Sequence, residues 1–450
     1  MTPGHDPLPL ILTLVAAALL SGCRAADTRR EPVPWPGGWN AVRDEASTLG
    51  KPAWRDMLVY TADLHRRATR SPADPFDHPW EEIGPGYLYG PAFGHWDLIH
   101  QLFDTLPTYP RHALDQLYNN LKLQQDNGFV PGAIWMPGGP TQREEVWWMD
   151  ETQGHPPVWI VAADEYVRLT GDDSVLPFFY AALVRQLGWF EQNRACADGG
   201  FYYADVTHRQ WESGIDESVR FDDLPPGLVA SPRACVDATS HVYWAYRHAA
   251  KWAAVLGEPS NEHEARAEQL GAFIRDKLYV SDDGMFYDAW AVDDPSLRRR
   301  TFDTMWPVVV GAASPAQAQR YIDEVLLDNV SFFTTHPMPA TAVDAAEYEP
   351  RMWRGGAWNS MTHWAARGCV DRGRPDAAAA LLERALDQSA RHFDRTGTIW
   401  EFYDPRGGPP EAMKRKGGPS ELDRPCRDYL GHNPLLAMAR LYDELSAARR

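Results

Sequence analysis

The sequence predicts an all-α protein, an (α/α)6 barrel in which six helical hairpins form a toroid with short β-hairpin loops around its mouth. Three observations predict this fold class. Apolar residues recur at helical spacing in about a dozen segments. Strand-like alternation is short and occurs only between these segments. A helix, a glycine turn and a short aromatic stretch follow one another repeatedly along the chain, as in repeat architectures.

The predicted helices are long and evenly distributed. The clearest segments are residues 111–125, 157–170, 174–193, 236–256, 261–278, 315–328, 375–393 and 433–448. The repeated glycine turns are found at residues 126–130, 198–203, 283–288 and 397–404, where glycine provides the left-handed end of a helix. About twelve helices in six hairpins fit a closed toroid, and an open helical solenoid is the structural alternative.

The N-terminal segment has the pattern of an export signal. Residues 10–20 are apolar except for Thr13, and the segment ends in Leu20-Ser21-Gly22-Cys23. Such a stretch is too short to span a bilayer but suits a secretory signal. The ending resembles a bacterial lipobox, which implies a lipoprotein signal peptide over residues 1–22 and an acylated Cys23. An ordinary cleaved signal is the alternative.

This N-terminal pattern predicts the domain organisation and the location. Residues 23–50 are expected to be a flexible tether, and residues 51–450 a single barrel domain that carries the catalytic site. We expect the protein to be exported and attached to the cell envelope, at the outer membrane or the periplasmic face. The lipid anchor would be its only contact with the membrane.

Composition restricts the partners. The chain has 44 basic and 62 acidic residues, a formal charge of −18, which argues against binding to nucleic acid. Its 19 tryptophans outnumber the 18 tyrosines and 16 phenylalanines, and a groove lined with indole rings suits the stacking of sugars. Composition therefore favours a protein that handles carbohydrate, while the oligomeric state stays open.

No cofactor or metal is expected. Motifs that bind nucleotides or mark hydrolytic nucleophiles and zinc proteases are absent from the sequence. The cysteines other than Cys23 are Cys196, Cys235, Cys369 and Cys426, and their spacing does not suit a zinc site. One or two disulfides or four free thiols are both compatible with the sequence.

Residues 210–221 form the most informative polar segment. It contains Trp211 and Arg220 among four nearby carboxylates, Glu212, Asp216, Glu217 and Asp222. Such surroundings can keep one carboxyl group protonated near neutral pH, as a general acid requires. A solvated acidic loop is the alternative.

A second carboxylate stands alone among aromatic residues. Glu401 lies between Trp400 and Phe402 in a strand-like stretch. A carboxylate in apolar surroundings is costly unless it is paired or used in chemistry. The alternative is a surface glutamate between two buried aromatic residues.

Three further segments carry polar and indole groups just before helices. Trp353, Arg354 and Trp358 open one helix, and two indole rings with a guanidinium suit the face and hydroxyl groups of a sugar. Packing of the two tryptophans is the alternative there. Trp96 with Asp97, and Gln153, precede or open two other helices and are further candidates for binding a substrate.

Together these segments resemble the trehalase-like glycoside hydrolases. The chain carries, in the order found in that family, H-W-D, N-G-F-V-P-G, T-Q with P-P, E-S-G-I-D-E-S-V-R-F, W-R-G-G-A-W-N, W-E-F-Y-D and Y-L-G. The resemblance covers about residues 80–445, to glycoside hydrolase families 37 and 63 and especially the mannosylglycerate and glucosylglycerate hydrolases. It implies an (α/α)6 barrel and inverting hydrolysis of α-linked glucosides or mannosides.

The resemblance also implies residue roles. Asp216 matches the general acid of the family and Glu401 its general base. The positions that match sugar contacts are Trp96, Asp97, Gln153, Trp353, Arg354 and Trp358. The chain departs from the family pattern in an extra residue after Gln153, in Gly356-Ala357, and in His432, where trehalases carry an aromatic residue. These departures fall in loops expected to contact the substrate.

The sequence thus predicts an inverting exo-α-glycosidase. Its substrate would be a glycosylglycerate, a trehalose-like disaccharide or the end of an oligosaccharide. Because glycerate carries a carboxylate, Arg143, Arg415 and Lys416 are candidate cations for its recognition. The alternatives are a non-catalytic glycan-binding surface lipoprotein, which would need neither Asp216 nor Glu401, and a phosphorolytic enzyme on the same fold.

Overall fold

Two rings of helices, one inside the other, organise the computed structural model, which describes residues 37–139, 142–208, 211–417 and 421–448. The predicted signal peptide and Cys23 lie outside the described residues. Within the described ranges, six inner helices line the axis, namely α4 (His95–Thr105), α6 (Trp159–Thr170), α10 (Val236–Leu256), α13 (Trp306–Val309), α16 (Asn359–Asp371) and α18 (Leu435–Ala448). Each packs against the next around the ring, and α18 packs against α4 to close it.

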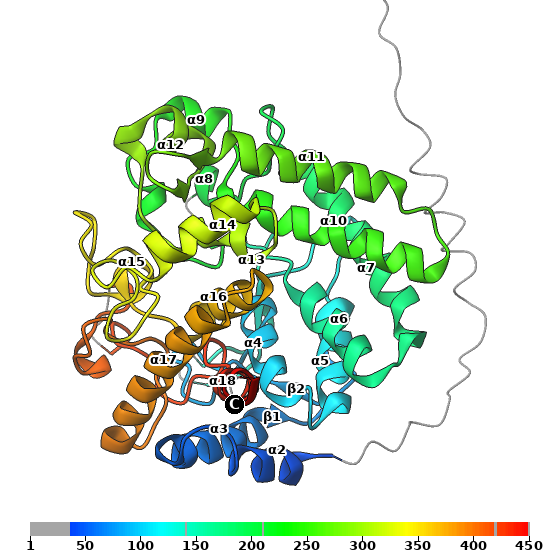
Figure 1. Cartoon of the computed structure of the whole chain (residues 1–450). Coiled ribbons are helices and arrows are strands. Elements are labelled where there is room, and N and C mark those ends of the chain that lie inside the picture. The colour runs from blue at the N-terminus through cyan, green and yellow to red at the C-terminus, as the bar shows by residue number, and fades with distance from the viewer. Residues whose placement is uncertain (1–36, 140–141, 209–210, 418–420, 449–450) are drawn as a thin grey trace, which may run out of the picture. The chain divides into compact units, whose positions relative to one another are not determined.

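The outer helices cover the inner ring (Figure 1). They are α3 (Arg55–Ala68), α5 (Pro110–Lys122), α7 (Leu176–Asn193), α11 (Asn261–Lys277), α14 (Pro315–Tyr321) and α17 (Pro375–Thr396). A π-helical stretch, Ile322–Leu326, continues α14. This arrangement confirms the predicted (α/α)6 barrel.

Burial explains why the two rings differ in sequence pattern. In the outer helix α17 the buried positions include Ala378, Leu382, Ala385 and Ser389, spaced by three or four residues as on one face of a helix. In the inner helix α4 every residue is buried, including polar ones such as His100. Helix α4 therefore lacks the alternation of apolar and polar faces that marks an outer helix.

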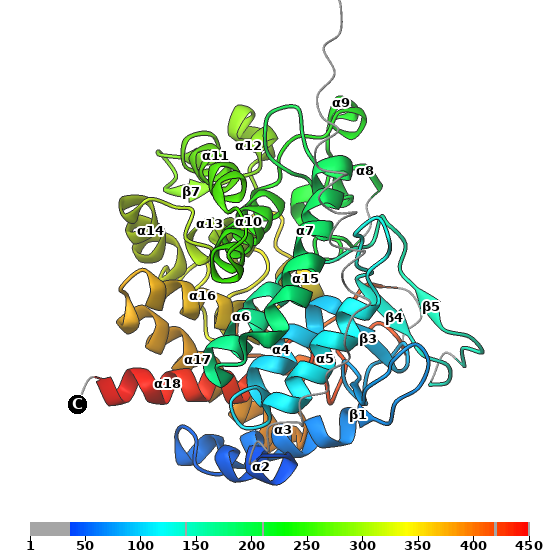
Figure 2. The same cartoon turned by 90° about the vertical axis from the view of Figure 1, so that its right-hand side faces the viewer.

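Short strands and helices fill the loops between the long helices. β1 (Thr69–Arg70) pairs with β2 (Trp80–Glu81), β6 (Tyr279–Val280) pairs with β7 (Met285–Phe286), and both pairs are antiparallel. β3 (Ala92–Gly94), β4 (Ala133–Trp135) and β5 (Trp147–Trp148) form a three-stranded antiparallel sheet. Figure 2 shows this sheet beside one end of α4 and α5. The short helices are α2 (Trp39–Ala46), α8 (Asp205–His208), α9 (Pro226–Ala230), α12 (Ala289–Asp293) and α15 (Met352–Gly355).

Helix α2 corrects the predicted tether. Its residues lie inside the range 23–50, yet Val42 and Ala46 are fully buried against α3. Glu45 also forms an ion pair with Arg440 of α18, with 2.8 Å between Oε1 and Nε. The folded unit therefore includes residues before 51. Helix α2 is held by a few buried contacts, and it is too short for its apolar pattern to show in the sequence.

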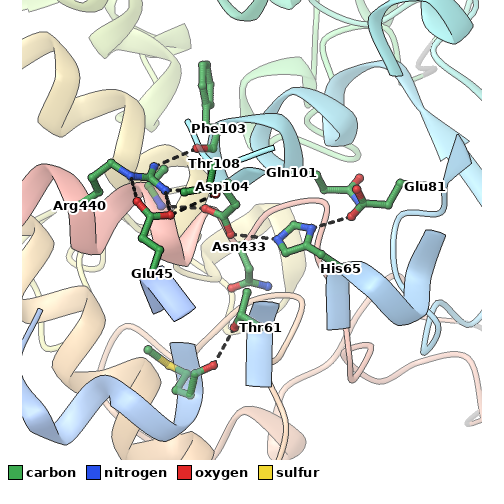
Figure 3. A network of polar contacts seen from close by, with 12 residues as sticks. Glu45, Thr61, His65, Glu81, Gln101, Phe103, Asp104, Thr108, Asn433 and Arg440 are labelled. Carbon is green, nitrogen blue, oxygen red and sulfur yellow. Dashed lines mark hydrogen bonds and ion pairs between the residues drawn. The ribbon is translucent and has the colours of Figure 1, made fainter. Parts of the chain in front are cut away.

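A buried polar network fastens the first helices to the last one (Figure 3). Asp104, in α4, accepts a hydrogen bond from the backbone of Ala437 in α18 at 2.8 Å, and its other oxygen lies 3.1 Å from His65 of α3. The opposite ring nitrogen of His65 lies 2.6 Å from Glu81 of β2. All three side chains are buried, so the ring is closed by ion pairs as well as by apolar packing.

The charges in this network are set by mutual contact. Burial alone would lower the pKa of His65, but Glu81 and Asp104 outweigh it and raise that pKa to about 10. Burial would likewise raise the pKa of Glu81, but His65 and His112 lower it to about 2. His65 is therefore a cation and Glu81 an anion at neutral pH.

The cysteines and the length of the helices bear on two questions that the sequence raised. The four cysteines at positions 196, 235, 369 and 426 are free thiols. Among the described residues, no helix has the length and apolar character that crossing a bilayer requires.

Candidate active site

A cavity of about 300 Å³ opens at the N-terminal ends of the inner helices. Trp96 and Asp97 reach it from the first turn of α4, Trp358 from the residue before α16, and His432 from just before α18. Aromatic side chains dominate the wall, namely Tyr87, Tyr89, Trp96, Trp135, Trp147, Trp211, Trp353, Trp358 and Tyr429. Such a wall offers flat apolar faces on which a sugar ring can stack.

Asp216 reaches the cavity from a loop that is held in place by the residues just before it. Glu212 accepts two hydrogen bonds from Arg194, at 2.7 and 2.9 Å, and Ser213 donates two to Asp205, at 2.8 and 3.0 Å. Gly214 has a φ of 75°, which bends the chain toward the cavity. These contacts present Asp216 at the cavity wall, where its side chain keeps 16% of its exposure.

The other carboxylates of this loop point elsewhere. Glu212 is buried on Arg194, whereas Glu217 is 40% exposed and pairs with Arg351 at 3.2 Å. Asp222 pairs with Arg354 at 2.7 Å. The segment is thus neither a solvated loop nor a cluster of four interacting carboxylates, and of these groups Asp216 lines the cavity.

Glu401 lies in the same cavity wall and is almost fully buried, at 1% exposure. Its backbone nitrogen donates to Cys426 O at 2.9 Å, and Cys426 N donates to its Oε2 at 3.0 Å. Arg415 binds both carboxylate oxygens, with Nε at 3.0 Å from each and Nη2 at 2.9 Å from Oε1. Glu401 is therefore a positioned, paired carboxylate and not a surface residue between two buried aromatic residues.

Arg415 remains charged in this buried setting. Burial lowers its pKa, but the Glu401 carboxylate outweighs that effect and raises it. The guanidinium also lies over the rings of Tyr87 and Tyr89, 5.8 and 4.8 Å from their centroids. The pair of Glu401 and Arg415 thus places a fixed anion in the wall without leaving net charge there.

Asp97 contributes a third carboxyl group to the cavity. Tyr429 donates a 2.6 Å hydrogen bond to its Oδ1, and His432 lies 3.6 Å from the same atom. Burial raises the pKa of Asp97 to about 7 despite the hydrogen bond from Tyr429, and Glu401 and Asp216 add to the rise. A β-carbon on Gly431 would approach Asp97 Oδ1 to 2.2 Å, so this position requires glycine.

Two indole rings form a flat stack beside the carboxyl groups. The rings of Trp353 and Trp358 are 3.4 Å apart between centroids and nearly parallel, at 5°. Both rings contact the edge of His432, and both residues line the cavity. The two tryptophans therefore pack on each other and also face the cavity.

Arg220 lies in a buried cluster of aspartates. It donates to Asp237 and, at 3.0 Å, to Asp288, and it lies 3.6 Å from Asp303. Cys235, Asp237 and Asp288 place possible metal-binding atoms within 4.8 Å of one another, but the guanidinium already occupies both aspartates. Arg220 is not among the described residues that line the cavity. Its contacts with three aspartates indicate that it holds loops together instead.

Gln153 and Arg354 are also outside the cavity lining of the described chain. Arg354 bonds to Glu349 at 2.6 Å, to Asp222 at 2.7 Å and to the backbone oxygen of Glu217 at 3.1 Å. The backbone oxygen of Gln153 accepts from Gly132 at 3.0 Å, while His155, two residues on, faces the cavity. Burial lowers the pKa of His155 to about 4, so its ring is neutral at pH 7.

The match to a known family confirms the resemblance in sequence. The family model for the mannosylglycerate hydrolase MGH1-like glycoside hydrolase domain matches residues 91–417. The chain belongs to this glycoside hydrolase family. Both Asp216 and Glu401 lie within the matched range. No curated protein sequence matches the chain.

Solved structures share the fold of this glycoside hydrolase. The family 63 mannosylglycerate hydrolase from Thermus thermophilus in complex with glucose is 17% identical, with a TM-score of 0.63 over 88% of this chain and 100% of its own. The same enzyme in complex with Tris and D-glycerate is 17% identical, with a TM-score of 0.64 over 87% of this chain and 100% of its own. Neutral trehalase from Saccharomyces cerevisiae is 13% identical, with a TM-score of 0.57 over 92% of this chain and 82% of its own.

The predicted cations all reach the cavity of the glycoside hydrolase, but in different states. Arg415 is bound to Glu401, and Lys416 Nζ forms an ion pair with Asp216 Oδ2. Arg143 lies over the rings of Trp135 and Trp147, 5.6 and 5.3 Å from their centroids. Its Nε is buried and has no hydrogen-bond partner among the described residues.

Sequence reasoning missed part of the aromatic wall. Tyr87 and Tyr89 lie in a loop before β3, and Trp135 and Trp147 lie on β4 and β5. Their pairing brings Trp135 opposite Trp147, with ring centroids 4.8 Å apart. Tryptophans clustered near residues 135 and 147 were the available signal, but the sequence does not show which strand pairs with which.

Proposed function

We propose that this glycoside hydrolase is an inverting exo-α-glycosidase that acts on a short α-glucoside or α-mannoside. The observation that carries the proposal is that Asp216 and Glu401, from loops 185 positions apart, line one cavity. The cavity volume, about 300 Å³, lies at the lower end of the range for small-molecule sites and suits a short substrate.

The environments of the two carboxyl groups support separate roles. Glu401 is held by the Arg415 guanidinium, which fixes its carboxylate in the position of a general base. In the proposed reaction it takes a proton from a water molecule, and that water attacks the anomeric carbon. Asp216 then donates its proton to the glycosidic oxygen as the bond to the aglycone breaks. This division of work uses each carboxyl group once and returns both to their starting states after proton exchange with solvent.

The charge of the cavity favours a glycosylglycerate over trehalose. Arg415 and Lys416 are already paired with carboxylates of the site, whereas Arg143 offers a guanidinium that stacks on two indole rings. Guanidinium groups bind carboxylates well because their N–H groups match the two oxygens. We therefore assign Arg143 to the carboxylate of a glycerate aglycone.

A matched pair of substrates tests this assignment. Glucosylglycerate and glucosylglycerol differ in whether the aglycone carries a carboxylate, and trehalose and mannosylglycerate complete the panel. Arg143→Gln should raise KM for glucosylglycerate by roughly 10–100-fold, the range for a lost charge-assisted hydrogen bond, and leave glucosylglycerol nearly unchanged. Arg168→Gln, a change at a side chain that is 65% exposed, is the control.

The results separate the levels of the proposal. Preference for trehalose would contradict the glycerate assignment and leave the glycosidase proposal standing. Absence of hydrolysis on all four substrates would contradict the glycosidase proposal itself. Asp216→Asn should be inactive on every substrate that the wild type cleaves.

We also propose that the enzyme is exported and anchored by lipid at Cys23. The support is the sequence Leu20-Ser21-Gly22-Cys23 after an apolar stretch. Cys23→Ala should leave the membrane fraction and lack the acyl chains seen by mass spectrometry on the wild type. A wild type without acyl chains, or with an N-terminus other than residue 23, would contradict the proposal.

A further inference from the structure

Consecutive residues of one loop contact the two carboxyl groups assigned to the reaction. Arg415 binds Glu401, and Lys416 forms an ion pair with Asp216. The Lys416 ammonium also lies 4.9 Å from the ring centroid of Trp211. The first pair is sealed, with side-chain exposures of 2% and 0%, whereas the second is open to the cavity, at 21% and 16%.

The two ion pairs have opposite consequences for inverting hydrolysis. That reaction needs an ionised base and a protonated acid at the same time. A nearby cation favours the charged form of a carboxyl group. Arg415 pairs with Glu401, the group that must be ionised, whereas Lys416 pairs with Asp216, the group that must carry the proton. The contact between Lys416 and Asp216 must loosen before Asp216 can donate a proton.

The other titratable groups around Asp216 do not substitute for Lys416. His155 and Asp97 share the cavity with Asp216, and so do Glu401 with its partner Arg415, and Arg143, which lies over two indole rings. His155 is neutral at pH 7 because burial lowers its pKa to about 4. Asp97 and Glu401 carry carboxyl groups and cannot act as the cation beside Asp216. Among the described groups, Lys416 is thus the cation in direct contact with Asp216.

An anionic leaving group can change this contact. The glycosidic oxygen that Asp216 protonates is bonded to the aglycone, so a carboxylate on a small aglycone enters the space beside Asp216 and Lys416. We propose that Lys416 is a positioning residue that couples the charge of the aglycone to proton uptake by Asp216. This inference rests on the proposed function, because it takes glycerate as the aglycone.

The step balances in charge and atoms. In the free site the Lys416 ammonium pairs with the Asp216 carboxylate. The entering carboxylate, which Arg143 binds in the proposed function, also attracts the ammonium away from Asp216, and Asp216 takes one proton from solvent, so one negative charge and one proton enter together. No covalent bond changes until Asp216 passes that proton to the glycosidic oxygen. A neutral aglycone does not attract Lys416, so the ion pair must open without help and cleavage is slower.

Calorimetric titration with D-glycerate measures the proton directly. At pH 7, the apparent binding heat of the wild type should depend on the ionisation enthalpy of the buffer with a slope that corresponds to net proton uptake. Lys416→Met and Asp216→Asn should each bind D-glycerate with a slope near zero. Lys414→Met, in the same loop at a side chain that is 66% exposed, should behave as the wild type.

Rates provide a second readout that a purely structural role would not move. Lys416→Met should extend the alkaline limb of the pH–rate profile for glucosylglycerol to higher pH, and Lys416→Arg should restore the wild-type profile. Glucosylglycerate should lose its advantage over glucosylglycerol in Lys416→Met.

The outcomes distinguish this inference from the proposed function. Binding of D-glycerate without proton uptake in the wild type would overturn the inference alone. So would uptake that persists in Asp216→Asn, which would assign the proton to another group such as Asp97, or an unchanged alkaline limb in Lys416→Met. Failure of D-glycerate to bind at all would overturn both the inference and the glycerate assignment.

Discussion

Replacing Glu81 by glutamine tests how the ring of helices is closed. The Glu81 carboxylate is buried and lies 2.6 Å from His65, 2.7 Å from His112 and 2.8 Å from Gln101. Glu81→Gln keeps the shape of the side chain but removes the charge that holds His65 as a cation. His65 then remains buried with Asp104 as its counter-ion, so the variant weakens the join between α3, α4 and α18.

The pKa values set the size of the effect. The fall in the pKa of Glu81 from 4.5 to about 2 corresponds to about 3 kcal/mol, at about 1.4 kcal/mol per pKa unit. The rise in the pKa of His65 from 6.5 to about 10 corresponds to about 5 kcal/mol, which is larger because it includes Asp104. We take the smaller value as the lower bound and expect Glu81→Gln to reduce the free energy of unfolding by about 3–5 kcal/mol, the range for breaking a buried ion pair.

Thermal unfolding measures this loss. With an unfolding entropy of about 2 cal/mol/K per residue over about 410 residues, 3–5 kcal/mol lowers Tm by roughly 3–6 °C. The matched control is Glu268→Gln, where the side chain is 78% exposed and pairs with Arg275 at the surface. That change should cost less than about 1 kcal/mol and move Tm by about 1 °C or less.

The dependence on pH has a defined sign. The His65 contribution is complete below pH 6.5 and is lost as pH rises toward 10. The Glu81 contribution is complete above pH 4.5 and is lost as pH falls toward 2. The difference in Tm between wild type and Glu81→Gln should therefore be largest near pH 5.5 and mostly gone at pH 10. A difference that is the same at both pH values, or no larger than that of the control, would refute this reasoning.

Three further predictions concern the cavity. Arg415→Met should reduce kcat by roughly 10²–10⁴-fold and lower Tm, because Glu401 is left as a buried, unpaired base, and Arg415→Lys should recover part of both. Asp97→Asn should raise Tm at pH 8.5 but hardly at pH 4, since a carboxyl group whose pKa is raised from 3.8 to about 7 destabilises the fold increasingly between these pH values and fully above them; an equal change at both pH values would contradict this. Gly431→Ala should abolish activity through displacement of Asp97, whereas Gly227→Ala, with open space around it, should not.

The fold was predictable to the extent that helices have two different faces. Residues 375–393 and 261–278 alternate between apolar and polar positions, and the structure has α17 and α11 there. The inner helices α4 and α13 are buried on all sides, so their sequences show no helical period that would distinguish them from a buried strand or loop. Helix α2 is too short to show a period. Closure of the ring was inferred from the number of hairpins, because contacts such as that of Asp104 with Ala437 join residues more than 300 positions apart.

The site was predictable where a residue type is costly unless used. Glu401 among aromatic residues and Asp216 in a glycine-broken acidic loop both line the cavity. Charged side chains nearby were harder to interpret, because an arginine serves equally well to bind a substrate or to join two loops. Arg220 and Arg354 bond to carboxylates that lie far along the chain, and only the fold shows those partners.

The stereochemistry of the first product tests the central claim most directly. If Asp216 is the acid and Glu401 activates a water molecule on the opposite face of the sugar, hydrolysis inverts the anomeric carbon. Proton NMR of an α-linked glucoside or mannoside, recorded before mutarotation, should show the β-anomer of the released sugar first. Initial release of the α-anomer, or a covalent sugar adduct on Glu401, would contradict the account.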